Sequence, residues 1–332
     1  MENSSHTELV RVLPSSLLPP LPSSLSSTEK PFIQANTVAS TLEEVKLQHI
    51  IPVFIKDNEP LISHSDFIEA TIEGVTSVLP GYQMLQPSVR LSHPIKGRIP
   101  EAKLKIAQDL EEYEKTLYYE RMAFIIEIPE ISDEVDGNHL SLTIGGVKSY
   151  SMDNLYGRKG QGEYFKLFIG FQNKVCTNLC VSTDGAQMSV RVADIGQLLG
   201  CIKSLIAQYN HGYHLFHLKG LGEASLTEQQ FANLLGRCRM YPYLPQQVRN
   251  DIQPMLFGDT QVGSIVKDYY RDDSFCKQAD GSINLWRLYK LFTNANKSTY
   301  IDQFVERSVN AFSLVYSIKH ALQKGSYNWY LN

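Results

Sequence analysis

The chain has 332 residues, of which 43% are hydrophobic and 20% are charged, a composition typical of globular proteins. Its 31 Lys and Arg against 35 Asp and Glu give a formal charge of −4, which excludes a global basic field that would attract nucleic acid or an anionic membrane. No run approaches the roughly 18 uninterrupted apolar residues of a membrane span, so we expect no membrane partner.

The first element in chain order is a Ser/Pro-rich segment that covers residues 1–40. Its first charged residue is Glu2, and several prolines interrupt its apolar stretch, so it lacks the pattern of a secretory signal. This composition cannot bury enough apolar surface to offset the entropy of ordering. We therefore predict a disordered tail, which is long enough to carry a short docking segment.

The region 41–224 combines short helices with a run of strands. Apolar residues at helical spacing indicate helices at 40–50 and 65–79, with Ser40 or Thr41 as the N-cap of the first. Alternating or continuous apolar residues indicate strands at 51–55, 88–95, 122–130, 139–147, 163–172, 173–183 and 186–192. Because most of these strands follow one another without an intervening helix, they favour an antiparallel sheet.

Helical spacing dominates from residue 193 to the end. Apolar stripes indicate helices at 195–209, 231–238, 285–292 and 301–322. The second stripe follows a capping box of Thr227 and Gln230, and the third follows Ser282. We therefore predict an α+β fold in which an antiparallel sheet domain with flanking helices, at 41–224, is followed by a helical region, at 225–332, packed on it.

The last helix has the clearest pattern of the chain. Its apolar residues form a single stripe with the small residues Ser308 and Ala311 at its centre, which suits close packing against another element. Thr299 and Asp302 lie where an N-terminal capping box would be.

Two cysteines, Cys176 and Cys180, fall on the predicted strand 173–183. Four residues of strand separate them by about 13 Å, too far for a disulfide, and no second ligand pair suggests zinc. We predict buried thiols; metal or redox use would require this segment to be helical or looped. The five cysteines are odd in number and follow no secretory signal, so reduced thiols in the cytoplasm are expected.

Three histidines, His211, His214 and His217, form a second apparent metal motif. Steps of three residues fan the rings around a helix axis, and on a strand the middle ring faces away from the other two. Neither geometry brings three imidazoles to one ion. We predict ordinary histidines on a half-exposed element, and no metal or cofactor.

An acidic segment, 109–134, carries nine carboxylates. It could supply a metal-dependent hydrolase or nuclease, although the spacing of Glu120 and Glu127 puts them on opposite faces of a regular strand. The common phosphate-binding and hydrolase motifs are absent from the sequence. The glycine pair in "LTIGGVKSY" indicates a bulge or a close backbone approach.

Two stretches, 90–105 and 148–174, are rich in basic residues, and the second also interleaves them with aromatic residues. A sheet surface of this kind can hold single-stranded nucleic acid, because cations neutralise phosphates and rings stack bases. The alternative is that the rings are partly core and the lysines solvate an outer face. The candidate nucleic-acid-binding residues are Arg90, Lys96, Arg98, Lys148, Tyr150, Tyr156, Arg158, Lys159, Tyr164, Lys166 and Lys174.

Several blocks, "SHPIKGRIPEA", "EKTLYYERMAF", "IGFQNKVCTNLCVSTDG", "TEQQFANLLG" and "LWRLYKLFTNANKSTYID", carry a family resemblance. They resemble an uncharacterised family, domain of unknown function 3871, frequent on Bacteroidetes conjugative elements. "KVCTN" and the late "NAF" segment are also similar to phage/plasmid-like proteins of unknown function. The resemblance implies a mobile-element context and a cytoplasmic protein, and it carries no catalytic residue to this chain.

These observations lead to three functional hypotheses. The first is a non-enzymatic accessory protein of a mobile element that binds or anneals single-stranded DNA, with a homo-oligomer suggested by analogy of fold. The second is the metal-dependent hydrolase or nuclease that uses the segment 109–134. The third is a protein-interaction or anti-defence factor with the tail as its docking segment.

Overall fold

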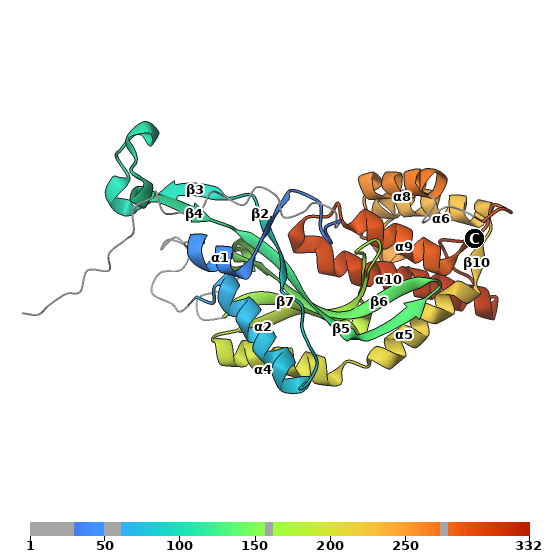
Figure 1. The fold of residues 1–332 in the computed structure, drawn as a ribbon. Helices are drawn as coiled ribbons and strands as arrows, with labels where there is room; N and C mark the ends of the chain where they lie inside the picture. The colour runs from blue at the N-terminus through green and yellow to red at the C-terminus, as the bar shows by residue number, and fades with distance from the viewer. Residues whose placement is uncertain (1–29, 50–60, 157–161, 273–277) are drawn as a thin grey trace, which may run out of the picture.

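The computed structural model describes residues 30–49, 61–156, 162–272 and 278–332 (Figure 1). Its central element is an antiparallel sheet with the strand order β1-β2-β5-β6-β7-β8, in which β9 also pairs with β7. The strands are β1 Thr37–Ser40, β2 Ser88–Ser92, β5 Arg121–Val135, β6 Asn138–Ser149, β7 Glu163–Asn173, β8 Leu179–Cys180 and β9 Ala186–Val192. The predicted α+β class and antiparallel sheet are confirmed.

Helices cover both faces of this sheet. One face carries α2 and α4, and the other carries α10 (Figure 1). Strand β5 shows the consequence, because Phe124 and Ile126 belong to the core cluster of α2, whereas Ala123 and Ile125 pack with Phe304 of α10. Burial on both faces explains why this strand is a continuous apolar run. The helices are α1 Leu42–Gln48, α2 His64–Val78, α3 Tyr150–Tyr156, α4 Ile195–Gln208, α5 His211–Lys219 and α10 Ile301–Lys324.

The glycine pair of β6 permits a close approach of α2 to the sheet. A Cβ on Gly146 would lie 2.2 Å from a ring atom of Phe67, and a Cβ on Gly145 would lie 2.2 Å from the Phe124 carbonyl oxygen. The Phe67 ring meets the Phe124 ring edge-on, with centroids 5.0 Å apart. The glycines therefore serve the close backbone approach that the sequence indicated.

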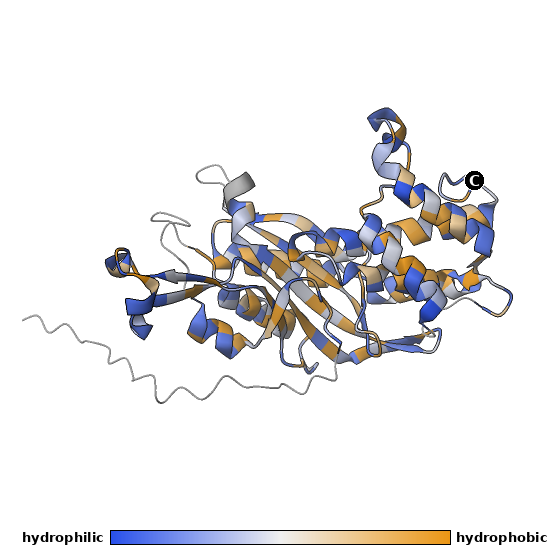
Figure 2. Cartoon of the chain, turned by 90° about the horizontal axis from the view of Figure 1, so that it is seen from above, coloured by the Kyte–Doolittle hydropathy of each residue, from blue (hydrophilic) through white to orange (hydrophobic). Residues whose placement is uncertain are grey.

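The C-terminal region adds helices to the end of the sheet. These are α6 Glu228–Met240, α7 Gln246–Asn250, α8 Asp259–Arg271 and α9 Leu285–Asn296, with a short ladder between β10 Ser225–Leu226 and β11 Ile283–Asn284. Trp286 and Tyr289 of α9 belong to the same core cluster as Phe171 of the sheet. Figure 2 shows the apolar residues along the strands and on the helix faces that meet. One core therefore joins the two predicted regions across the boundary at residue 224.

Capping residues fix several helix ends as the sequence predicted. Capping boxes are present at Thr41 and Glu44 of α1 and at Thr227 and Gln230 of α6. Two other starts were predicted wrongly. Helix α9 is capped by Asn284 rather than Ser282. Helix α10 begins after Tyr300 without a side-chain cap, because the Thr299 hydroxyl instead accepts a hydrogen bond from Arg307.

Residues 30–40, predicted as the end of a disordered tail, belong to the folded body. Phe32 and Ile33 are buried in the cluster beside Phe304, and the Phe32 and Phe304 ring centroids are 6.0 Å apart. Strand β1 then forms a sheet edge by pairing with β2. This part of the tail prediction is wrong because two buried apolar residues in a short segment leave little periodic signal. Residues 1–29 and the strand predicted at 51–55 lie outside the described residues.

The strand predicted at 173–183 is interrupted. Strand β7 ends at Asn173, whose side-chain oxygen accepts hydrogen bonds from the backbone N–H groups of Val175 and Cys176, and this local turn competes with the ladder. Cys180 follows on the two-residue strand β8. Cys176, Cys180 and Cys238 are nevertheless buried free thiols, Cys201 is half-buried, and Cys276 lies outside the described residues. No helix in the described part of the chain combines the length and apolar character of a membrane span.

Candidate functional site

The predicted basic and aromatic surface is not formed by its central residues. Lys148, Tyr150 and Lys166 are buried. The Lys148 ammonium lies 2.6 Å from the Glu163 carboxylate and 2.8 Å from that of Asp153. The prediction that these three residues face solvent is wrong. Helices cover both faces of the strands β6 and β7 that carry the two lysines, and Tyr150, the first residue of α3, packs against His64 of α2 with ring centroids 4.7 Å apart.

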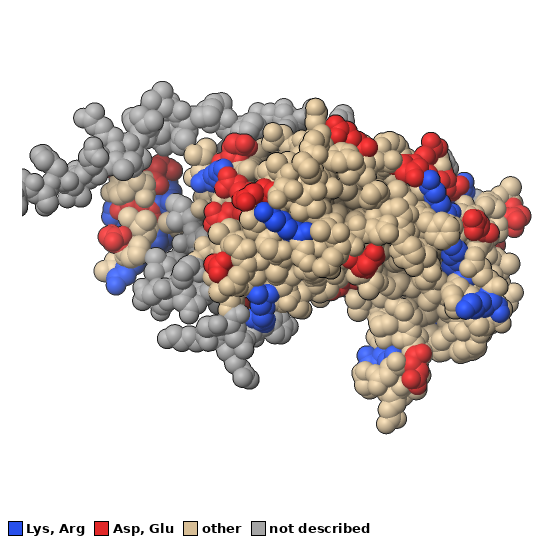
Figure 3. Space-filling model, turned by 90° about the horizontal axis from the view of Figure 1, so that it is seen from below, with Lys and Arg blue, Asp and Glu red and all other residues tan. Residues whose placement is uncertain are grey.

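The other predicted residues are dispersed. Arg90 donates to Thr37, Lys174 pairs with Glu127, and the Tyr164 hydroxyl donates to the Met188 carbonyl. On strand β3, Ile95–Arg98, Lys96 is exposed and Arg98 donates to the Lys105 carbonyl. The side chain of Tyr156 and residues Arg158 and Lys159 lie outside the described part. Figure 3 shows Lys and Arg intermixed with Asp and Glu on the face that it displays.

The carboxylates of the acidic segment are also spread along the fold. Glu114 pairs with Lys105, and Asp133 pairs with Lys219 at 2.6 Å. Glu127 accepts a hydrogen bond from the Ser141 hydroxyl at 2.8 Å. Within the described ranges, no group of three or more His, Cys, Asp or Glu side chains could hold a metal ion.

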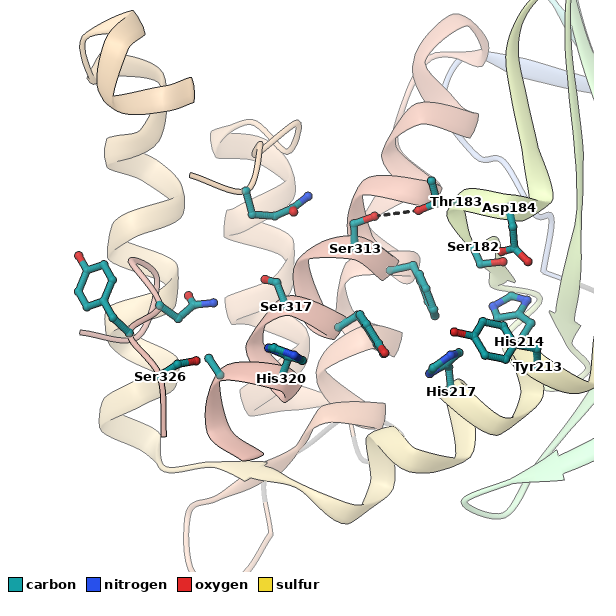
Figure 4. A pocket seen from close by; sticks show the side chains of 16 residues that line it. Ser182, Thr183, Asp184, Tyr213, His214, His217, Ser313, Ser317, His320 and Ser326 are labelled. Atoms are coloured by element: carbon teal, nitrogen blue, oxygen red, sulfur yellow. Dashed lines mark hydrogen bonds between the residues drawn. The ribbon is translucent and has the colours of Figure 1, made fainter. Parts of the chain in front are cut away.

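A cleft of about 780 Å³ lies where the β8–β9 loop, α5, α10 and the C-terminal segment meet (Figure 4). The residues that line it are Ser182, Thr183, Asp184, Tyr213, His214, His217, Gln253, Phe312, Ser313, Tyr316, Ser317, His320, Ala321, Ser326, Tyr327 and Asn328. Its volume is within the range of roughly 300–1,000 Å³ that small-molecule sites occupy. We take this cleft as the candidate functional site.

His214 is the buried polar residue of this cleft. Its side chain is almost fully enclosed, and burial lowers its pKa to about 3, so the ring is neutral at physiological pH. Its Nδ1 lies 2.5 Å from the Tyr209 hydroxyl. Burial raises the pKa of Tyr209 well above its ordinary value, so this phenol keeps its proton and can donate it to Nδ1. We therefore assign the ring proton to Nε2, a buried atom with no hydrogen-bond partner in the described structure.

Aromatic rings form the walls beside His214. The Phe312 ring meets His214 edge-on at 5.2 Å between centroids, and Phe312 and Tyr316 lie nearly parallel at 5.8 Å. His217 is held between Tyr213 and Tyr316, with centroid distances of 4.2 and 4.9 Å. Burial lowers the pKa of His217, and the nearby Lys319 lowers it further. These contacts fix the rings, which therefore offer preorganised apolar faces.

Hydroxyl and amide groups supply most of the remaining polar lining. Besides the tyrosines, five Ser and Thr residues contribute hydroxyls from three parts of the fold: Ser182, Thr183, Ser313, Ser317 and Ser326. The Thr183 and Ser313 hydroxyls lie 3.3 Å apart across the cleft edge (Figure 4). Among the described residues that line the cleft there is no Lys or Arg, and Asp184 contributes one carboxylate. The lining therefore offers many neutral donors and acceptors but little charge.

Sequence reasoning singled out the histidines of α5 but not their role. As predicted, the three rings do not converge: His214 and His217 line the cleft, and His211 is exposed outside it. The groups opposite them come from α10, about one hundred residues later in the chain. No local pattern signals a contact at that separation.

A family model described as "Domain of unknown function, B. Theta Gene description (DUF3871)" matches residues 21–331. No curated protein matches the chain. No solved structure matches it either.

Proposed function

The chain belongs to the DUF3871 family, and from the geometry of its cleft we propose that it is a binding protein for a small uncharged molecule with hydroxyl groups and an apolar ring face, such as a sugar. The observation that carries this proposal is the Nε2–H donor of His214, which is buried in the wall of the cleft and has no acceptor among the described residues.

An unpaired buried donor is unfavourable by about 1–3 kcal/mol. A ligand oxygen that accepts from Nε2 would recover this free energy on binding. The bond between Tyr209 and Nδ1 holds the ring in one orientation, so the ligand would not have to order it.

Charge selects among ligands of suitable size. A phosphate or carboxylate group would enter a cleft whose described lining has no Lys or Arg side chain and one carboxylate, Asp184. The free energy that this charged group loses when it leaves water would be compensated poorly by such a lining. A hydroxyl-rich ligand would instead meet mostly neutral hydroxyl and amide partners, and its apolar face could lie against Tyr316 or Phe312.

The length of the cleft agrees with this class. The lining residues of α10 run from Phe312 to Ala321, which corresponds to about 14 Å at 1.5 Å per residue. This length fits a mono- or disaccharide better than an extended polymer.

Titration calorimetry of the full chain with neutral mono- and disaccharides, and with their phosphorylated and amino counterparts, tests the proposal. We expect a neutral sugar to bind and its phosphate to bind at least about tenfold more weakly. His214→Phe keeps an aromatic ring at this position but removes the Nε2–H donor, and it should weaken sugar binding about tenfold or more. His211→Phe, at the exposed start of α5, is the matched control and should leave affinity unchanged. Preference for the charged ligands, or equal loss in both variants, would contradict the proposal.

Single-stranded DNA binding is a second candidate. The observation that favours it is the Arg191 guanidinium, which lies 5.5 Å from the Tyr164 ring centroid on neighbouring strands. Such a basic-aromatic pair suits a stacked base. Replacing Arg158 and Lys159 by Glu should lower the slope of log affinity against log salt by about 1.4 if both contact phosphate. An unchanged slope would contradict it. A mobile-element context and a cytoplasmic location complete this proposal.

A further inference from the structure

Strands β3 Ile95–Arg98 and β4 Lys115–Tyr118 form a two-stranded ribbon that extends away from the body (Figure 1). Between them the chain forms short 3₁₀ turns at Pro100–Ala102, Ala107–Asp109 and Glu112–Glu114. We call residues 95–118 the arm. Its two strands pair only with each other in the described structure.

The arm carries large apolar side chains into solvent. Leu104 is 90% exposed, Tyr113 67%, Ile106 62% and Ile95 49%. A two-stranded ribbon with four paired positions is at best marginally stable in water, and both of its outer edges have open backbone groups. Contact with a partner would cover the apolar residues and stabilise the ribbon.

The charges of the arm are divided between its two legs. The outgoing leg, 95–105, carries four basic residues and one acidic residue, whereas the returning leg, 106–118, carries four acidic residues and one basic residue. Lys105 pairs with Glu114 and Lys115 with Glu112 inside the arm. Lys96, Lys103 and Asp109 are exposed, and no ion pair joins them to another described residue. The arm therefore presents a basic side and an acidic side.

We propose that the arms of two copies of this chain pair with each other, basic leg against acidic leg. A two-fold axis that runs along the paired arms places each basic leg over the partner's acidic leg, so the contact is self-complementary and closed. The exposed apolar residues Leu104, Ile106 and Tyr113 lie in the middle of this contact, and the charges determine its register.

Analytical ultracentrifugation of the full chain over a concentration and salt series tests the proposal. We expect a dimer that weakens as salt rises, because the exposed charges are screened. An acidic-arm variant, Lys96→Glu with Lys103→Glu, should be monomeric, since both legs are then acidic. A basic-arm variant, Asp109→Lys with Glu112→Lys, should be monomeric for the converse reason.

The decisive experiment mixes the two variants. Their arms are fully complementary, so the mixture should form a one-to-one heterodimer although neither variant dimerises alone. All four positions are exposed, so folding should be retained, and circular dichroism checks it. A monomeric wild type, a wild-type dimer that persists in both variants, or a mixture that remains monomeric would each overturn the proposal.

Discussion

Lys297 should make the stability of the protein rise with pH in a specific window. Its side chain is buried at the end of α9, where the ammonium donates hydrogen bonds to the Cys176 carbonyl and, at 2.8 Å, to the Thr177 hydroxyl. No carboxylate pairs with it in the described structure, and burial lowers its pKa from 10.5 to about 8. The folded protein is therefore destabilised by a charge that the unfolded chain keeps in water.

The sign of the effect follows from proton binding. Between pH 8 and 10.5 the folded state has lost the proton while the unfolded state retains it, so the free energy of unfolding rises with pH. From pH 7 to 9.5 the gain is about 2 kcal/mol, at 1.36 kcal/mol per pKa unit. Lys297→Met keeps the length of the side chain and removes this titration.

Urea titrations of wild type and Lys297→Met at several pH values measure the difference. Tyrosines and thiols that titrate in the same range affect both proteins equally, so their effect cancels in the difference. We expect the wild type to gain about 2 kcal/mol over the variant from pH 7 to 9.5. Parallel curves would refute the reasoning, since they would show that Lys297 is solvated or that an unrecognised partner holds its charge.

Three further predictions concern stability. Deleting residues 1–29 should leave the thermal midpoint unchanged. Deleting residues 1–40 should lower it by several degrees, because β1 and the buried Phe32 and Ile33 are then lost. Equal changes in the thermal midpoint for the two deletions would contradict this prediction. Ala311→Leu should lower the free energy of unfolding by about 1–3 kcal/mol through overpacking, whereas Gln303→Leu on the exposed side of α10 should not, as urea titration can show. Below pH 6.5 the free energy of unfolding of the wild type should fall faster than that of His214→Phe, because the ring binds a proton in the unfolded chain but not in the folded protein, where its pKa is about 3. Urea titrations of both proteins at several acidic pH values measure this, and an equal loss of stability would disprove it.

Local signals in the sequence predicted most elements of the fold. The capping box of Thr227 and Gln230 and the apolar runs of β5, β6 and β7 depend on neighbouring residues, so their structural meaning does not require the rest of the chain. The interrupted strand after Asn173 shows the limit of such signals. One side chain that bonds two backbone N–H groups outweighed a favourable β composition.

The burial of the predicted site could not be predicted in the same way. Lys166 is on a strand face that the late helix α10 covers, and its ammonium donates to the Asp302 carbonyl and the Glu306 carboxylate. Lys148 lies instead over the Phe165 ring, in the core that α2 covers, and pairs with Glu163. A lysine that solvates a sheet and a lysine that pairs beneath a helix have the same local sequence. The contact between His214 and Phe312 is equally non-local. Site prediction failed where the environment was set by elements distant in the sequence.

The two proposals concern separate parts of the molecule. The arm extends from one end of the sheet (Figure 1), whereas the cleft is lined by α5, the second half of α10, the β8–β9 loop and the C-terminal segment. No residue of the arm lines the cleft. Pairing of arms would therefore leave both clefts of a dimer open, and charge reversal on the arm leaves the ring faces and hydroxyls of the cleft in place. Because neither site supplies a group to the other, the two proposals can fail separately. A dimer that binds no sugar would refute only the proposal for the cleft, and a monomer that binds sugar would refute only the proposal for the arm.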